Sequence, residues 1–228
     1  FLNLTVKSAK PVVLVGAMRP ATAVSADGPL NIINAVKAAT DAASAGQGVL
    51  VMMNDEIYSG RDVTKTNTAN VATFKAPNGG PLGFIVGGEV HYYYRSVRPH
   101  TLQSEFDVTG VTALPRVDII YTHIGEDRVF VDAALAAGAR GIIYAGSGMG
   151  SIHEAVEAAL AEAVGRGVVV VRSSRTGSGI VVAGLERWQE QGFLYADNLN
   201  PQKARLLLQL ALLRTQERSE VQGVFLKY

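Results

Sequence analysis

The sequence lacks cysteine altogether, since none of its 228 residues is Cys. This absence excludes disulfides, thiolate catalysis and cysteine-based metal sites, and it leaves the cellular compartment open. A charge excess is also missing, because 21 basic and 20 acidic residues give a formal net charge of +1. Nucleic acid and anionic membranes are therefore not indicated as partners. No apolar run approaches the roughly 20 residues that cross a bilayer, while 48% hydrophobic content suffices for real cores, so we expect a soluble globular protein.

Metal and hydrolase signatures are scarce as well. No G-x-S-x-G segment occurs, which argues against an α/β-hydrolase. The four histidines have neither an i, i+4 pairing nor a carboxylate-spaced partner, so we expect no metal site. These histidines are His91, His100, His123 and His153.

The first part of the chain predicts a strand, a helix and a second strand, which form a parallel pair with a crossover. The strands are expected at residues 10–17, as a buried strand, and at 48–53. The helix between them is expected at 29–45, with apolar residues at helical spacing. Residues 1–7 indicate the end of a helix, and we expect the chain to be part of a longer polypeptide. The apolar helix residues are Ile32, Ile33, Val36 and Ala39.

A polar loop, residues 53–68, is expected to follow the second strand. Ligands of open α/β sheets bind beyond the carboxyl ends of the strands, so this loop is the first place to look for chemistry. Lys65 stands there between Thr64 and Thr66, with Asp62 close by. A lysine among hydroxyls and a carboxylate can relay a proton or polarise a nucleophile. The alternative is a solvated surface lysine.

The rest of the chain predicts an antiparallel addition, a linker and a second domain. Residues 81–95 contain two β-rich runs around Gly87-Gly88, a two-residue hairpin signal. Residues 96–115 lose periodicity, and we interpret them as a linker. Strands and helices alternate beyond it, which predicts a parallel sheet sandwiched by helices. The strands are expected at 117–121, 141–145 and 168–172, the helices at 127–137 and 151–164, and a last helix after the cap Asn200, with Leu206, Leu207, Leu210, Ala211 and Leu213 buried.

Glycine-rich loops end two of these later strands. Residues 146–151 would suit an anion, but their G-x-G-x-G spacing and the lack of an acidic partner about 20 residues on argue against a dinucleotide site. Ser151 also opens a capping-box pattern with Glu154. In residues 172–179, arginines would bind a phosphate or a carboxylate, or pin the loop through carbonyl groups, and we favour pinning. Residues 184–191 indicate an exposed polar loop.

Seven motifs along the whole chain resemble bacterial type II L-asparaginases. Each is weak alone, but seven in register are specific. They are Val-Gly-Ala-Met-Arg-Pro (15–20), Ser-Ala-Asp-Gly-Pro (25–29), Met-Asn-Asp (53–55), Gly-Arg-Asp-Val-Thr-Lys-Thr (60–66), Ala-Gly-x-Gly-x-Gly-Ser (145–151), Val-Arg-Ser-Ser-Arg (171–175) and Leu-Asn-Pro-Gln-Lys-Ala-Arg (199–205).

The resemblance implies an α/β fold of two domains: a larger N-terminal mixed sheet flanked by helices, truncated here to 1–95, and a smaller C-terminal parallel-sheet domain, 116–228. It implies a homotetramer with active sites at subunit boundaries, no cofactor, and hydrolysis of the side-chain amide of L-asparagine. L-Glutamine is a further candidate substrate, since one methylene separates the two by only about 1 to 3 kcal/mol. A threonine would form the acyl-enzyme.

The resemblance also assigns roles to four residues. Lys65 matches the lysine of the catalytic relay, where burial among neighbours would favour its neutral amine. Ala17 matches a strand-end position whose backbone contacts the scissile amide. Ser151 and Glu186 match positions that reach the substrate amino group across the subunit boundary, and Glu186 is the softer match because its loop departs in length and composition.

Both catalytic threonines and the relay aspartate of the family are expected upstream of Phe1, so the chain alone is predicted to be inactive. The resemblance suggests a periplasmic enzyme, with the cytoplasm as the alternative compartment. A non-catalytic amino-acid-binding or nucleotide-binding α/β protein remains the alternative function, and ammonia release from asparagine separates the two.

Overall fold

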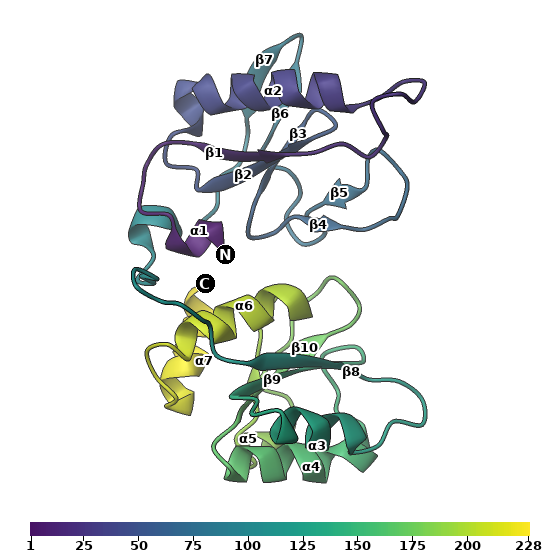
Figure 1. Ribbon diagram of the computed structural model, residues 1–228, viewed down its shortest axis with the longest axis vertical. Coiled ribbons are helices and arrows are strands. Elements are labelled where there is room, and N and C mark those ends of the chain that lie inside the picture. Colours follow the sequence, from purple (N-terminus) through teal and green to yellow (C-terminus); the bar gives the residue numbers. More distant parts are fainter. The chain divides into compact units, whose positions relative to one another are not determined.

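The computed structural model describes residues 1–228 and divides into two compact units, residues 1–107 and 108–228 (Figure 1). Each unit has an α/β architecture of its own, so the predicted fold class is confirmed. The division falls inside the segment predicted as a linker, 96–115, whose bounds stay a prediction. None of the helices combines the length and the apolar composition that a membrane-spanning helix needs.

The first unit is built on a five-stranded sheet in the order β1-β2-β3-β6-β7. β1 pairs with β2 in parallel, and the other neighbours are antiparallel. The predicted strand-helix-strand start and the hairpin at Gly87-Gly88 are confirmed. The elements are α1 (Leu2–Thr5), β1 (Val12–Val15), α2 (Gly28–Thr40), η1 (Ala42–Ser44), β2 (Val49–Met53), β3 (Glu56–Ser59), β6 (Gly83–Val86), β7 (Glu89–Tyr92) and η2 (Thr101–Gln103), with a separate ribbon of β4 (Thr64–Lys65) and β5 (Phe74–Lys75).

All five residues of β2 are buried, and their side chains pack on both faces of the sheet. Successive side chains of a strand point to opposite faces. Leu50 and Met52 accordingly pack in a cluster with Ala35 and Ala38 of α2. The alternate side chains of β2 pack in a second cluster, against which Phe74 of the ribbon lies.

The polar loop predicted at 53–68 is wrong in its first part, because β3 begins immediately after a two-residue turn. Asn54 and Asp55 adopt positive φ angles of 53° and 61°, the conformation of a tight hairpin turn that Asn and Asp tolerate. Ile57 and Tyr58 then return into the sheet and are fully buried. The Asn-Asp pair was the available signal for this hairpin.

α2 turns its asparagine and alanine side chains, not its large apolar ones, towards the sheet. Asn31 and Asn34 are buried, whereas Ile32, Ile33 and Val36 are 54–57% exposed. The Asn31 side-chain NH2 donates to the Gly16 carbonyl (3.0 Å), and its oxygen accepts from the Asn54 N–H (3.1 Å). Apolar spacing therefore marks the outer face of this helix.

β1 lies at the edge of the sheet, so the prediction of a buried strand at 10–17 is wrong. Leu14 and Val15 are 45% and 42% exposed. Its only ladder partner is β2.

The second unit is a four-stranded parallel sheet in the order β11-β10-β9-β8. Figure 1 shows α3, α4 and α5 on one face and α6 on the other. This confirms the predicted sandwich. The elements are β8 (Val117–Tyr121), α3 (Val129–Ala136), β9 (Gly141–Gly146), α4 (Glu154–Gly165), β10 (Val169–Ser174), α5 (Glu186–Glu190), β11 (Leu194–Tyr195), α6 (Pro201–Ala211) and α7 (Arg218–Lys227).

The core of this unit lies between the two central strands and α4. All six residues of β9 are buried, and Ile142 packs in one cluster with Leu160 of α4 and Val170 of β10. Full burial of one such side chain stabilises the fold by about 1.5–3 kcal/mol. Two buried strands with no exposed face are typical of a parallel sheet covered on both sides.

The C-terminal helices only partly follow the prediction. Asn200 caps α6 as expected, since its side chain accepts from the Lys203 N–H (3.0 Å). Leu207, Leu210 and Ala211 are buried, but Leu206 is only half-buried and Leu213 lies beyond the helix end and is 36% exposed. α7 was not predicted, because its buried residues, Val221 and Phe225, are only two.

Candidate active site

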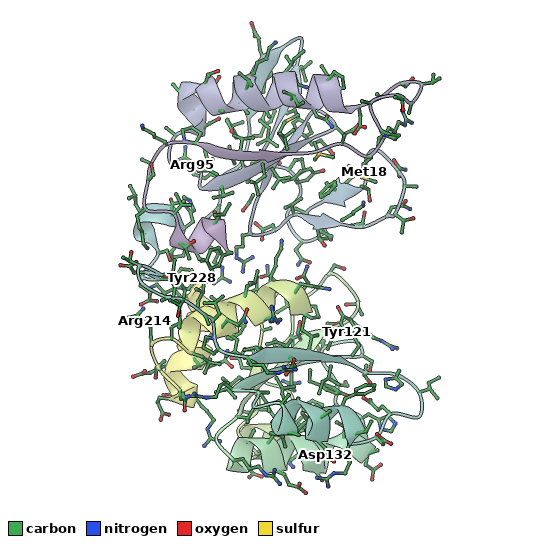
Figure 2. The ribbon with its side chains drawn as sticks, viewed as in Figure 1. Met18, Arg95, Tyr121, Asp132, Arg214 and Tyr228 are labelled. Atoms are coloured by element: carbon green, nitrogen blue, oxygen red, sulfur yellow. The ribbon has the colours of Figure 1, made fainter.

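A partly buried polar network fixes the chain beyond the end of β1, where Ala17 lies. The Asp27 carboxylate accepts from the N–H groups of Met18 and Arg19 (2.9 Å each) and from the Asn31 amide (3.1 Å). Although burial acts in the opposite direction, these hydrogen bonds hold the pKa of Asp27 below its ordinary value. Figure 2 labels Met18, whose side chain packs against the buried cluster of Val51, Met53, Tyr58 and Ala76.

Ala17 itself is exposed and has a small side chain. A Cβ at Gly28 would lie 3.2 Å from the Cβ of Ala17, so the chain at Gly28 passes close to Ala17. The backbone at Ala17 is thus held in place by its neighbours and open to solvent. Contact of this backbone with a scissile amide stays a prediction.

Lys65 lies on β4 opposite Phe74 of β5. The ribbon is closed by hydrogen bonds from the Thr66 N–H to the Thr73 carbonyl (2.9 Å) and from the Asn67 N–H to Thr73 Oγ1 (2.6 Å). The Lys65 side chain is exposed. The expected burial of Lys65 among its neighbours is therefore wrong for the residues of this chain, and its role in a relay stays a prediction.

Lys75, the second lysine of the ribbon, is placed differently. Its ammonium forms an ion pair with Glu56 (2.7 Å). The same Glu56 oxygen accepts from the Tyr58 hydroxyl (2.5 Å). Burial, together with Glu56, raises the pKa of Tyr58 far above its ordinary value. The two lysines thus share one ribbon, and Lys75 is tied to the sheet.

In the second unit, Ser151 closes a compact loop after β9. Its N–H donates to the Ser147 carbonyl (2.9 Å), and the two residues form a β-bridge. A Cβ at Gly146 would lie 2.3 Å from the Ser151 carbonyl oxygen, so only glycine fits there. The Ser151 residue is exposed. The loop turns back on itself before α4 and does not open the helix as a dinucleotide loop does.

The predicted capping box at Ser151 and Glu154 is wrong. The N-cap of α4 is His153, whose Nδ1 accepts from the Ala155 N–H (3.2 Å). Ser151 lies outside the helix because its N–H is already engaged in the loop. This frees the serine hydroxyl from a capping role.

Glu186 is the first residue of the short helix α5 and is exposed. The prediction of an exposed irregular loop at 184–191 is wrong at its centre, because Trp188 is buried. The indole N–H of Trp188 donates to Glu157 (3.0 Å). This tryptophan anchors α5 to α4.

Arg172, in the middle of β10, is completely buried. Its guanidinium donates to the carbonyls of Gly150 (3.3 Å), Val182 and Ala183 (2.6 Å) and lies 4.6 Å from the centre of the Trp188 ring. Burial lowers the pKa of Arg172 to about 10. The predicted pinning of loops by arginines is confirmed here.

Arg175 pins a third loop, since it donates to the Thr122 carbonyl beyond β8 (2.7 Å). Beneath that loop lies a buried carboxylate that sequence reasoning missed: Glu126 accepts from Thr122 (2.5 Å) and from the Tyr144 hydroxyl (2.8 Å). Burial raises the pKa of Tyr144 to about 12. The Tyr144 hydroxyl also accepts from the His153 N–H (3.2 Å), so the start of α4 is tied to β9.

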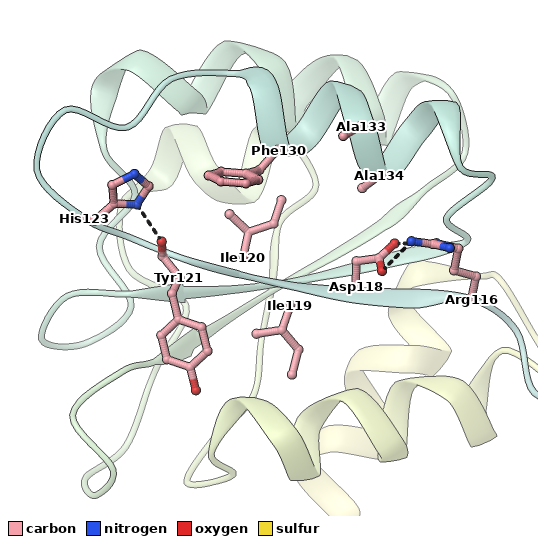
Figure 3. Close-up of a pocket in the computed structure, with 9 residues that line it drawn as sticks. All are labelled: Arg116, Asp118, Ile119, Ile120, Tyr121, His123, Phe130, Ala133 and Ala134. Carbon is pink, nitrogen blue, oxygen red and sulfur yellow. Dashed lines mark hydrogen bonds and ion pairs between the residues drawn. The ribbon is translucent and has the colours of Figure 1, made fainter.

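A groove of about 520 Å³ lies beside β8 and α3 (Figure 3). Its lining includes the ion pair of Arg116 and Asp118, together with Tyr121, His123 and Phe130. None of the four predicted site residues lines it. The groove is therefore distinct from the predicted substrate-binding residues of this unit, Ser151 and Glu186.

Comparison with known proteins decides the family. Residues 1–98 match the family model described as "Asparaginase, N-terminal", and residues 116–225 match "Glutaminase/Asparaginase C-terminal domain". A solved structure, the "Probable Cytoplasmic L-asparaginase from Campylobacter jejuni", is 47% identical with a TM-score of 0.96, covering 99% of this chain and 74% of that one. The chain belongs to the asparaginase family. The resemblance stated from seven motifs is thereby confirmed.

Curated relatives of this asparaginase-family chain are similar over its whole length. "L-asparaginase 2" of Escherichia coli is 49% identical over 100% of the chain and 66% of that protein. "Probable L-asparaginase periplasmic" of Haemophilus influenzae is 48% identical over 99% of the chain and 65% of that protein. The chain thus spans a little under two thirds of the length of these relatives.

Proposed function

We propose that the complete natural protein containing these residues hydrolyses the side-chain amide of L-asparagine to L-aspartate and ammonia. The observation that carries the proposal is the match of both asparaginase-family models, in order, to a fold that also matches a solved L-asparaginase. L-Glutamine is proposed as the second substrate, because the family description of residues 116–225 names glutaminase.

The proposed reaction proceeds through an acyl-enzyme. A threonine hydroxyl attacks the amide carbon, ammonia leaves with the proton that the relay supplies, and water then cleaves the ester to release aspartate. Lys65 is proposed to take part in the proton relay. Its support is the resemblance of residues 60–66 to the family motif, together with the ion pair that already engages Lys75, the other lysine of the ribbon, with Glu56.

Substrate contacts are proposed for three further residues. The backbone at Ala17 is open beyond β1 and would contact the amide group. Ser151 and Glu186 are exposed on adjoining loops of the second unit and would hold the substrate ammonium in the active site of a neighbouring subunit. A charge-assisted contact of this kind contributes on the order of 1.5–3 kcal/mol.

The test is ammonia release by the purified complete protein. We expect turnover of L-asparagine that is unchanged by a metal chelator, and a measurable ratio of kcat/KM for L-asparagine over L-glutamine. An acyl-enzyme is expected to accumulate, trapped by hydroxylamine as aspartate hydroxamate. Protein that is folded but releases no ammonia from either amide would refute the proposal.

Assembly and location are proposed together with the activity. A homotetramer is proposed, because the exposed positions of Ser151 and Glu186 suit contact with substrate in another subunit. Sedimentation equilibrium of the complete protein measures it, and a monomer that is fully active would contradict it. A periplasmic location is proposed from the relative named periplasmic, and cell fractionation distinguishes it from the cytoplasm named for the Campylobacter protein.

A further inference from the structure

The two loops that carry Ser151 and Glu186 leave different strands, β9 and β10. No hydrogen bond links these two residues directly, and both are exposed. One buried side chain nevertheless contacts both loops. Arg172 donates to the carbonyl of Gly150, which precedes Ser151, and to the carbonyls of Val182 and Ala183, shortly before Glu186.

We propose that Arg172 is a positioning residue that sets the separation of Ser151 and Glu186, and through it the binding of the substrate ammonium. The inference rests on the proposed function, since it takes Ser151 and Glu186 as substrate contacts. Arg172 acts through backbone carbonyls of the two loops and touches no substrate.

The shape of the guanidinium suits this role. Its planar fork presents several N–H donors in fixed directions, so one side chain can hold carbonyls of two loops at a defined spacing. A lysine ammonium at the same place would be a compact point charge on a flexible stem. The arginine also stacks on Trp188, the only tryptophan of the chain, which fixes the plane of the fork.

The free-energy cost of burying the Arg172 guanidinium supports a specific role for this residue. Arg172 is fully buried, and its contacts are carbonyl groups and an aromatic ring, with no carboxylate in an ion pair. Burying a cation without a counter-ion is expensive, and apolar replacements of buried charges are often neutral or stabilising. The guanidinium stays protonated near neutral pH, because burial lowers its pKa only to about 10.

Both loops carry a glycine with a positive φ where they pass Arg172. Gly184 has a φ of 75°, and a Cβ there would lie 2.9 Å from Trp188 Cε3 and 3.0 Å from both Nη atoms of Arg172. Gly150 has a φ of 77°, and a Cβ there would lie 2.9 Å from Val181 and 3.1 Å from the Ser173 carbonyl oxygen, with the Arg172 Cβ at an ordinary contact distance of 3.5 Å. The guanidinium and its tryptophan partner therefore require glycine at position 184, independently of the hydrogen bonds, whereas Gly150 is required by its other neighbours.

The test compares Arg172→Lys and Arg172→Met with a matched control, Arg187→Lys, in the complete protein. Arg187 is also an arginine near Trp188, at 5.6 Å, but it is exposed and pairs with Glu157 (2.9 Å). We expect Arg172→Lys to raise KM for L-asparagine at least about tenfold with kcat changed less than about threefold, because binding contacts made in ground and transition state are weakened alike. Arg187→Lys is expected to leave both constants unchanged.

Amide hydrogen exchange supplies a readout that is independent of activity. In Arg172→Lys we expect faster exchange at residues 147–151 and 180–186, and altered emission of the single tryptophan. A wild-type KM in Arg172→Lys, with Ser151→Ala and Glu186→Gln both raising KM, would overturn the inference while leaving the proposed function intact. Failure of the proposed function shows instead as absence of ammonia release by the parent protein, and the exchange experiment then still decides whether Arg172 joins the loops.

A further variant tests the inference if the Arg172 variants do not fold. If Arg172→Met and Arg172→Lys do not fold, Gly184→Ala disturbs the Val182 and Ala183 side, where the added Cβ would meet the Trp188 ring (2.9 Å) and both Nη atoms of Arg172 (3.0 Å). We expect the same rise in KM there, and an unchanged KM with a folded Gly184→Ala protein counts against Arg172 as a positioning residue.

Discussion

Each unit holds its strand-end loops with buried polar side chains, which are neutral amides in the first unit and a positively charged guanidinium in the second. In the first unit, neutral amides of α2 do so: Asn31 bonds to Gly16 and Asn54, and Asn34 donates to Asp55 (2.7 Å). In the second unit a single cation, Arg172, bonds to the carbonyls of two loops. The comparison teaches that a buried side chain can satisfy loop backbone groups that no strand ladder reaches, whether it is a neutral amide or a guanidinium.

The largest expected effect on turnover distinguishes Lys65 from Lys75, the two lysines of the ribbon formed by β4 and β5. Lys65→Ala is expected to lower turnover of L-asparagine by about 10²- to 10⁴-fold with the fold retained, because a positioned proton-transfer group is lost. Lys75→Ala is the matched control. It removes the half-exposed ion pair with Glu56 and is expected to change turnover less than about threefold. Steady-state kinetics with circular dichroism of each variant measures this, and wild-type turnover of Lys65→Ala would exclude Lys65 from the mechanism.

A second prediction concerns α2, in which we expect a buried asparagine to contribute more to stability than a large apolar residue does. Asn31→Ala is expected to destabilise the first unit by about 1–3 kcal/mol, because the Gly16 carbonyl and the Asn54 N–H lose their buried side-chain partner. Ile33→Ala, on the exposed face of the same helix, is expected to stay within about 0.5 kcal/mol of the parent. Urea unfolding followed by far-UV circular dichroism compares the two. A larger loss for Ile33→Ala would mean that α2 packs by its apolar face.

The first unit also contains a buried histidine with a pH signature. Burial lowers the pKa of His100 from its ordinary 6.5. The unfolded chain therefore binds a proton at a higher pH than the folded one does, and stability is full above pH 6.5 and falls as the pH drops towards the folded pKa. His100→Gln is expected to flatten this slope between about pH 7.5 and about pH 5.5. Equal slopes of the urea midpoint against pH in parent and variant would contradict the assignment to His100.

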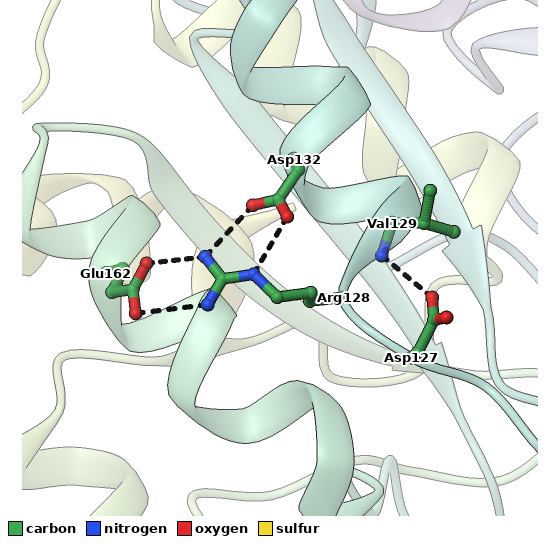
Figure 4. A network of polar contacts seen from close by, with 5 residues as sticks. All are labelled: Asp127, Arg128, Val129, Asp132 and Glu162. Atoms are coloured by element: carbon green, nitrogen blue, oxygen red, sulfur yellow. Dashed lines mark hydrogen bonds and ion pairs between the residues drawn. The ribbon is translucent and has the colours of Figure 1, made fainter.

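The smallest effect is expected at the outer surface of the second unit. Figure 4 shows Arg128 between Asp132 and Glu162, with closest contacts of 2.8 and 2.7 Å. Hydrogen bonds that the Arg128 guanidinium donates to both carboxylates raise the pKa of Arg128. Because all three side chains are solvated, Arg128→Ala is expected to shift the melting temperature by no more than about 2 °C. A shift as large as that of Arg172→Met would remove the distinction between paired surface arginine and buried carbonyl-bound arginine.

Elements fixed by local rules could be predicted from the sequence. Gly87-Gly88 gives a hairpin because both residues adopt positive φ, and Asn200-Pro201 starts α6 because the Asn side chain accepts a first-turn N–H. The apolar strand β9 and the apolar first half of β10 were found because burial on both faces leaves a continuous hydrophobic run. Pinning by Arg172, later in β10, was favoured because the segment that follows is rich in glycine and hydroxyl residues.

Features that depend on contacts with residues of other elements could not be predicted from the sequence. The orientation of α2 depends on Gly16 and Asn54, which lie on other elements, so its apolar spacing was misleading. Ser151 fits a capping pattern, but its N–H already bonds within the loop, and His153 caps α4 instead. The buried carboxylate Glu126 follows a short polar loop and carries no motif; Thr122, four residues earlier, was the one available hint. Lys65 was singled out by its hydroxyl and carboxylate neighbours, but the roles of all four site residues came from family resemblance, since spacing alone names no substrate.

Leu30, Ile32, Ile33 and Val36 form an exposed apolar ridge on the outward side of α2, through which copies of the chain would attract one another. Attraction between such ridges strengthens with warming and with excluded salts such as sulfate, and it weakens in urea and in the cold. Where this ridge is uncovered, clouding on warming and early precipitation by sulfate follow directly from which face of one helix the asparagines occupy.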